Sequence, residues 1–321
     1  MKGVILVENS FVHPYMPNSV PENKKAMLDE LGINSVEDIY KSIIPDELLY
    51  KERLDIPEPI RSEYELKRHV MGILNRDITT EEYTSFLGAG CYKHQVPAIC
   101  DEINSRGEFL TAYCGDTYSD HGKMQAIFEY TSMMGELLDT DVVSYTTYDG
   151  GQAVASSLRM AVRAVREKGM AGKVILVPKT MNPEIYSQVV QYCRNVAEVR
   201  KIAYEPETGL MDLEELKEQL AKKNVAAVFF ENPTYLGNFE TRGEEIAKLA
   251  HDAGAYCVVQ TEVAALGIME SPVNQGADIV CGDIQPLGMH IQFGGGQAGF
   301  IACNQNMDLV EQFPTYMYGI T

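Results

Sequence analysis

From about residue 108 onward, short apolar runs alternate with segments of helical periodicity, and this alternation limits most strongly what the chain can fold into. Strands that alternate with helices of roughly 10–15 residues predict a mostly parallel sheet covered by helices on both faces. The runs with strand character are Val174–Val177, Val225–Phe230, Tyr256–Val259, Ile279–Val280 and Gly299–Ala302. Helical periodicity marks the segments Met124–Leu138, Val154–Val165, Pro183–Cys193, Asp212–Leu220 and Gly243–Ala253. The fold class predicted from this pattern is α/β.

Residues 1–80 have a different character, because they contain short helical segments with no strand pattern between them. Pro21 begins a first helix that Gly32 ends, Ser35 begins a second, and Ser62 begins a third with a capping box. Their narrow apolar stripes cannot form a core alone, so they must pack on the following domain or on another chain. We therefore expect a helical N-terminal arm over residues 1–80 and one large α/β domain over residues 81–321.

The charge and the cysteines exclude several classes of function. The chain has 27 Lys and Arg against 46 Asp and Glu, a formal net charge of −19, which opposes binding to nucleic acid or to an anionic membrane. The early apolar run Val4–Val7 is too short for a signal sequence or a spanning helix. The seven cysteines are scattered and form no C-x-x-C pair, which predicts reduced thiols in a cytoplasmic protein.

Motifs for metals and nucleotides are weak. Cys91 and His94 could form half of a metal site, but no second pair has ligand spacing, so we expect no metal. The glycine-rich nucleotide fingerprints are absent. Asp149 and Gly150 precede a predicted helix, whose N-terminus attracts anions. Asp149 is itself an anion in the capping position, so helix capping is favoured over phosphate binding.

A long segment after residue 84 is periodic neither as a helix nor as a strand, and it is rich in glycine and aromatic residues. Such a loop in an α/β chain is a candidate site for substrate or partner, and the alternative is a packed surface loop. The candidate residues in it are Gly88, Gly90, His94, Tyr113 and Tyr118.

Matching stretches run in order from about residue 14 to residue 301, and together they resemble the α subunit, or N-terminal half, of glycine decarboxylase, the P protein of the glycine cleavage system. The principal stretches are Ser85–Gly90 with His94, Gly107–Tyr113, Gln125–Tyr130, Tyr148–Gly150, Asn232-Pro233, Ala247–Gly254, Gly276–Val280, Gln285–Gly288 and Phe293–Gly295.

This resemblance implies the large domain of the pyridoxal-phosphate (PLP) enzymes related to aspartate aminotransferase, known as fold type I. Such enzymes bind PLP as a Schiff base on a lysine near the last strands. In this chain Gln285 lies near the place of that lysine, and no Lys or Arg occurs from Leu249 to Thr321. An amide cannot act as the amine, so we expect no covalently bound PLP here. The expected remnant of the cofactor cleft consists of Asp149, Gly150, Glu262 and Gln285, with Glu262 near the place of the acidic partner of the PLP ring.

The family's αβ unit removes CO2 from glycine and passes the aminomethyl group to the lipoyl arm of the H protein. The resemblance thus implies a subunit of a glycine dehydrogenase (aminomethyl-transferring), an oxidoreductase complex, that is not catalytic alone. It would complete the active site of a lysine-bearing β subunit that carries PLP. The implied partners are this β subunit, the lipoylated H protein, and glycine or another small amino acid.

The chain departs from the family pattern at Cys114–Gly122 and at Gly296, and it ends before the family's smaller C-terminal domain. Two other hypotheses stay open. The chain could be a stand-alone ligand-binding or regulatory module on a degenerate PLP-enzyme fold. Alternatively, it could be a self-sufficient PLP enzyme that uses an earlier lysine, such as Lys179.

Overall fold

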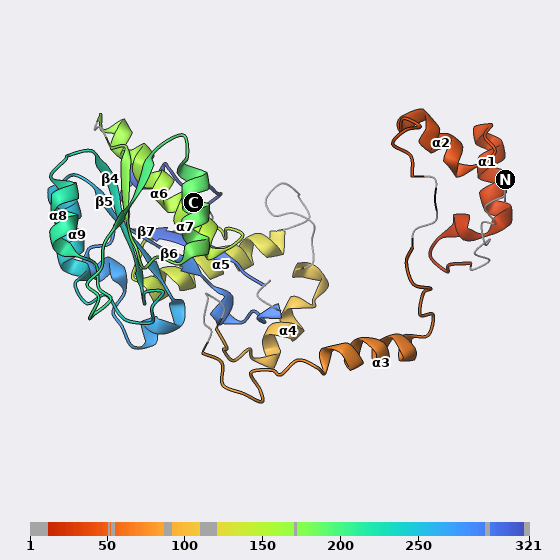
Figure 1. The fold of residues 1–321 in the computed structure, drawn as a ribbon, viewed down its shortest axis with the longest axis horizontal. Coiled ribbons are helices and arrows are strands. Elements are labelled where there is room, and N and C mark those ends of the chain that lie inside the picture. Colours follow the sequence, from red (N-terminus) through yellow and green to blue (C-terminus); the bar gives the residue numbers. More distant parts are fainter. Residues whose placement is uncertain are drawn as a thin grey trace. The chain divides into compact units, whose positions relative to one another are not determined.

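The computed structural model describes residues 12–50, 52, 55–86, 92–109, 121–169, 172–292 and 296–317. The chain divides into two compact units, Met1–Ile78 and Thr79–Thr321, which are coloured by sequence in Figure 1. The predicted domain boundaries and the missing C-terminal domain stay predictions. None of the described helices is long and apolar enough to cross a membrane.

The first unit contains the 3₁₀ helix Pro17–Ser19 and the helices α1 (Pro21–Leu31), α2 (Val36–Ile43) and α3 (Glu63–Leu74), the three predicted helices. Gly32 ends α1 in the left-handed conformation, with φ of 67°, which glycine adopts without strain. The Asp38 carboxylate accepts the N–H of Ser35 at 3.1 Å and fixes the start of α2. None of the three helices has a buried residue, and their packing on the second unit or on another chain stays a prediction.

The second unit is built on a seven-stranded sheet in the order β1-β7-β6-β5-β4-β2-β3. Its strands are β1 (Val142–Val143), β2 (Val174–Pro178), β3 (Glu198–Ile202), β4 (Val225–Asn232), β5 (Tyr256–Thr261), β6 (Ile279–Asp283) and β7 (Gly299–Cys303). Strands β2 to β6 run parallel, and β7 pairs antiparallel with both β6 and β1. The prediction of a mostly parallel sheet is confirmed, as are the five predicted strands.

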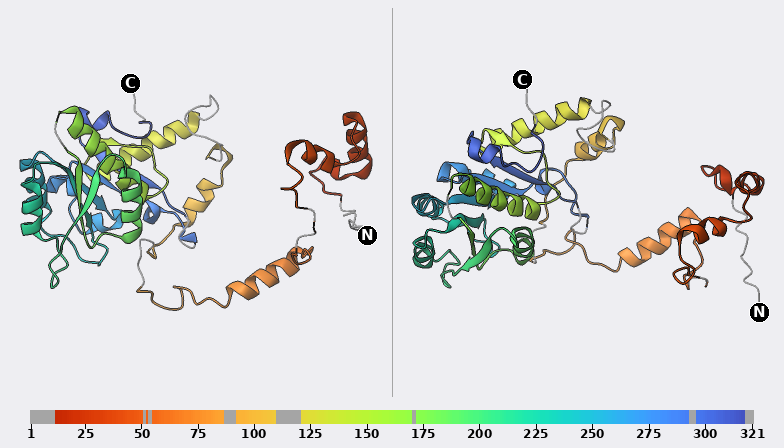
Figure 2. Two further views of the ribbon diagram at one scale, coloured as in Figure 1. Left: turned by 45° about the horizontal axis from the view of Figure 1, so that its top comes forward. Right: turned by 90° about the horizontal axis from the view of Figure 1, so that it is seen from above.

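The helices of this unit are α4 (Ala98–Asn104), α5 (His121–Leu138), α6 (Gly150–Glu167), α7 (Pro183–Cys193), α8 (Leu213–Leu220), α9 (Gly243–Asp252) and α10 (Met307–Val310). Short 3₁₀ helices cover Gly107–Phe109, Val263–Gly267, Pro272–Gln275 and Gln285–Leu287. The helices cover the two faces of the sheet, with α6 and α7 on one and α8 and α9 on the other (Figures 1 and 2). Leu158 of α6 is buried in the same core as Phe229 of β4, whereas Ile246 of α9 is buried in the other with Val228.

The strands β1 and β3 were not predicted. Strand β3 lies at the edge of the sheet and pairs only with β2. Three of its five residues, Glu198, Arg200 and Lys201, are charged, and only Ile202 in it is buried. Strand β1 has two residues and owes its conformation to its pairing with β7. An edge strand buries little surface, so its sequence lacks the apolar run that marks a central strand.

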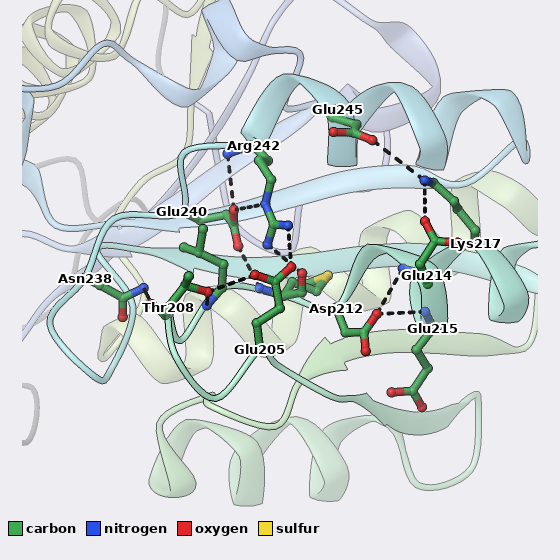
Figure 3. Close-up of polar contacts among 12 residues, drawn as sticks. Glu205, Thr208, Asp212, Glu214, Glu215, Lys217, Asn238, Glu240, Arg242 and Glu245 are labelled. Atoms are coloured by element: carbon green, nitrogen blue, oxygen red, sulfur yellow. Dashed lines mark hydrogen bonds and ion pairs between the residues drawn. The ribbon is translucent and has the colours of Figure 1, made fainter.

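The segment that follows β4 is fixed by the side chain of Arg242 (Figure 3). Its guanidinium donates to the Glu205 carboxylate at 2.8 Å, to the Met211 carbonyl oxygen at 2.7 Å and to the Glu240 carboxylate at 3.3 Å. Glu240 is only 3% exposed and also accepts the N–H of Met211 at 2.9 Å. These bonds hold the end of segment 233–242 against the loop 203–212, and the first half of the same segment lines the cavity described below.

We expect Arg242→Met to lower the free energy of unfolding by about 3 kcal/mol, because it leaves the buried Glu240 carboxylate without its counter-ion. Adding Glu240→Gln to this variant should restore part of the loss. The control is Lys217→Met, which breaks an exposed ion pair with Glu214 and should cost less than about 1 kcal/mol. Urea denaturation measures all three, and equal losses for Arg242→Met and Lys217→Met would contradict this account.

Candidate functional site

A cavity of about 590 Å³ lies at the carboxyl ends of β2, β4, β5 and β6 and at the N-terminus of α6. The helix after β2 covers one face of the sheet and the helix after β4 covers the other, and ligands of open α/β sheets bind where the connections diverge in this way. The walls include Asp149–Gly151, Glu231, Pro233–Gly237, Gln260–Glu262 and Asp283.

Two carboxylates cap the N-terminus of α6 at this cavity. Asp149 accepts the N–H of Gln152 at 2.6 Å, which confirms the predicted helix cap. Asp283, at the end of β6, accepts the N–H of Gly150 at 2.9 Å and that of Gln285 at 2.8 Å. A Cβ atom on Gly150 would lie 3.1 Å from the Cβ of Asp283, so glycine permits this close approach of helix and strand. Both carboxylates lie at the positive end of the helix dipole, where negative charge is stabilised.

This donor set does not fit a phosphate-bearing cofactor such as PLP. A phosphate binds through N–H donors and positive charge. The N–H groups of Gly150 and Gln152 already serve carboxylates, and none of the described residues that line the cavity is Lys, Arg or His. Gln285 is 3% exposed and is not part of the lining, because its amide donates to the carbonyl oxygen of Gly296.

Burial raises the pKa of three carboxyl groups in the lining. Glu231 is 5% exposed, and its oxygens accept the N–H of Asn182 at 3.1 and 3.2 Å. The loss of hydration outweighs these bonds and raises the pKa of Glu231 to about 7. Burial also raises the pKa of Glu262, with a smaller effect from the charge of Asp283, and it raises the pKa of Asp283 itself. The lining is therefore rich in carboxyl groups that hold their protons more tightly than usual.

His94 lies beside this cavity and does not line it. Its Nε2 is 2.6 Å from the carbonyl oxygen of Met289 and its Nδ1 is 2.9 Å from that of Tyr92. Nearby, Nε2 of His290 is 2.9 Å from the Asp101 carboxylate on α4. These contacts tie α4 and the segment before it to the loop after β6, and they position Tyr92 in the cavity wall.

The structure thus places Asp149, Gly150 and Glu262 in the lining and Gln285 outside it. Four other candidates from the sequence, Gly88, Gly90, Tyr113 and Tyr118, lie outside the described residues. Sequence reasoning missed Glu231, Thr261 and Asp283. Each lies within three residues of the end of a predicted strand, at the carboxyl edge where open α/β sheets bind ligands. Polar residues at the ends of the predicted strands could therefore have identified them as candidates.

The raised pKa of Glu231 predicts a pH dependence of stability. Between its ordinary value of 4.5 and about 7, the folded chain binds more protons than the unfolded chain, so stability falls as the pH rises through this window. The loss from this group approaches about 3 kcal/mol. Glu231→Gln cannot ionise, so its stability relative to wild type should be greater near pH 8 than near pH 5.

Urea denaturation across this pH range measures the difference. Glu184→Gln, at an exposed residue of the same lining, is the control and should leave the wild-type profile unchanged. A constant difference between Glu231→Gln and wild type at every pH would show that Glu231 does not titrate in this way.

Comparison with known proteins agrees with this architecture. Residues 13–321 match the family model of the glycine cleavage system P-protein. The probable glycine dehydrogenase (decarboxylating) subunit 1 of Staphylothermus marinus is 35% identical, and that of Pyrococcus horikoshii is 38% identical. Each match covers 96% of this chain, and the chain spans 66% of the length of each relative.

The crystal structure of a glycine decarboxylase (P-protein) in inhibitor-bound form matches with a TM-score of 0.77 and 32% identity, over 95% of this chain and 65% of that one. An Oryza sativa TDC solved with PLP and tryptamine matches with a TM-score of 0.55 at 14% identity, which shows the shared fold of the fold-type I PLP enzymes. On the extent of these matches, the chain belongs to the glycine cleavage system P-protein family.

Proposed function

We propose that this chain is the first subunit of a two-subunit glycine dehydrogenase (decarboxylating), in which a second subunit holds PLP on its own lysine. The observation that carries this proposal is the identity of Gln285, two residues after the end of β6. Gln285 is an amide that cannot form a Schiff base, and its side chain is bonded to the Gly296 carbonyl oxygen. The carboxylates on the N–H groups of Gly150 and Gln152 support the same conclusion, since they oppose a phosphate in this chain.

In this proposal the complex decarboxylates glycine and passes the aminomethyl group to the lipoyl arm of the H protein. The chemistry belongs to the second subunit, and this chain forms part of the wall and entrance of that subunit's active site. The segment Tyr92–Pro97, held by His94, is the described part of the chain that we assign to this contact. The helices α1 to α3 enclose no core of their own, so they need a further surface to pack on, which a second chain or the second unit could supply.

The purified chain should bind no PLP as an aldimine and should show no glycine-dependent CO2 exchange. Co-expression with a lysine-bearing second subunit should yield a complex that exchanges CO2 with glycine when lipoylated H protein is added. A lysine of this chain that becomes labelled by PLP and borohydride would overturn the proposal. Lys179→Ala tests the candidate lysine directly, and it should leave the activity of the complex unchanged. Failure of the two chains to co-purify would also count against the proposal.

His94→Ala should leave the complex assembled but lower its kcat by about tenfold, because the segment that shapes the entrance loses its contact with Met289 and shifts. The matched control is His251→Ala. His251 also bonds one residue distant in sequence, Asp278, at 2.8 Å, but it lies on α9 and does not line the cavity. Equal effects of the two substitutions on CO2 exchange would contradict the proposal that His94 positions the segment at the entrance.

A further inference from the structure

The cavity at the carboxyl edge of the sheet has an unusual balance of charge. Five carboxyl groups from separate elements line it: Asp149, Glu184, Glu231, Glu262 and Asp283. The described lining residues include no basic side chain. The local field therefore attracts cations and repels anions.

Backbone N–H groups are the direct hydrogen-bond partners of most of these carboxyl groups. Backbone N–H groups serve Asp149, Glu231, Glu262 and Asp283, at distances from 2.6 to 3.3 Å. Within the described part of the chain, none of the five carboxyl groups forms an ion pair. Burial raises the pKa of Glu231, Glu262 and Asp283, and for Glu262 it outweighs the opposing effect of the His94 charge.

A second observation at the end of β5 is independent of charge. Thr261 is 1% exposed, lines the cavity, and its Oγ1 has no hydrogen-bond partner. The adjacent Gln260 also lines the cavity, and its Oε1 is buried without a partner. Buried polar atoms in native proteins nearly always have a partner. An amide oxygen can only accept, so the missing ligand group is a hydrogen-bond donor.

The remaining walls decide between a metal ion and an organic cation. Among the described residues, no three His, Cys, Asp or Glu side chains converge where a metal ion could sit. The lining also contains apolar side chains, including Ile185, Pro233 and Leu236. A cavity of about 590 Å³ lies in the range of small-molecule sites, which is roughly 300–1,000 Å³. Carboxylates with an apolar wall suit an ammonium group on a hydrocarbon body.

We propose that this cavity binds a primary aliphatic amine in its ammonium form, through the oxygens of Glu262, Asp283 and Thr261. An ammonium group has three donors and no acceptor, so it satisfies the unpartnered oxygen of Thr261 and the carboxylates of Glu262 and Asp283 at once. The hydrocarbon chain lies against Ile185 and Leu236. This site goes beyond the proposed function, since it concerns a ligand of this chain and does not require the second subunit.

Isothermal titration of the full chain with pentylamine tests the site, with pentanol and pentanoate as the neutral and anionic molecules of similar shape. We expect binding of pentylamine alone. Glu262→Gln should weaken it roughly tenfold or more, because a charge-assisted bond is lost. Thr261→Val, which keeps the shape of the side chain, should weaken it several-fold. Glu214→Gln, an exposed residue of α8 outside the cavity, should bind as the wild type does.

The proposal would be overturned if pentylamine did not bind or if pentanoate bound equally well. It would also be overturned if either Glu262→Gln or Thr261→Val bound pentylamine with the affinity of the wild type. Thermal unfolding of each variant separates a lost site from a lost fold, and Thr261→Val keeps the test decisive if Glu262→Gln fails to fold. Failure of the chain to join a glycine dehydrogenase complex would leave these titrations unaffected, so the two proposals fail independently.

Discussion

The contact between the N-terminus of α6 and the end of β6 is the interaction on which the rest of the second unit depends. Helix α6 is buried along most of its length, and its buried face packs against the central strands of the sheet. The Asp283 carboxylate accepts the N–H of Gly150 at 2.9 Å, and the missing side chain at Gly150 allows this approach. The same contact places a second carboxylate, besides Asp149, at the positive end of the helix dipole.

This arrangement explains how a chain can keep the fold of a PLP enzyme while its cavity suits different chemistry. The position of the cavity follows from the sheet, because the helices after β2 and β4 leave on opposite faces. The charge of the cavity comes from carboxyl side chains at its walls, which do not belong to the two hydrophobic cores. Carboxylates cap the N-terminus of α6, which could otherwise hold a phosphate. Gln285, two residues after β6, is an amide. The scaffold and the ligand chemistry are thus set by different residues.

Much of the fold could be predicted because central strands are buried on both faces and their sequences are continuous apolar runs, as in Val225–Phe230. The edge strand β3 escaped prediction because burial, which makes such runs necessary, is slight there. At the site, the Asp149 cap was predictable since it acts on a residue three positions away. The bond between Asp283 and Gly150 was not, because the two residues are 133 positions apart.

By itself the sequence determined the α/β alternation, the capping of α6 and the absence of any Lys or Arg from Leu249 to Thr321. These are properties of composition or of contacts within one turn of chain. Only the tertiary structure decided that Glu231 and Asp283 line the same cavity as Asp149 and Glu262, and that the Thr261 hydroxyl has no hydrogen-bond partner there. The packing of separate elements removes Glu231, Glu262 and Asp283 from water. The loss of hydration raises the pKa of each of these carboxyl groups.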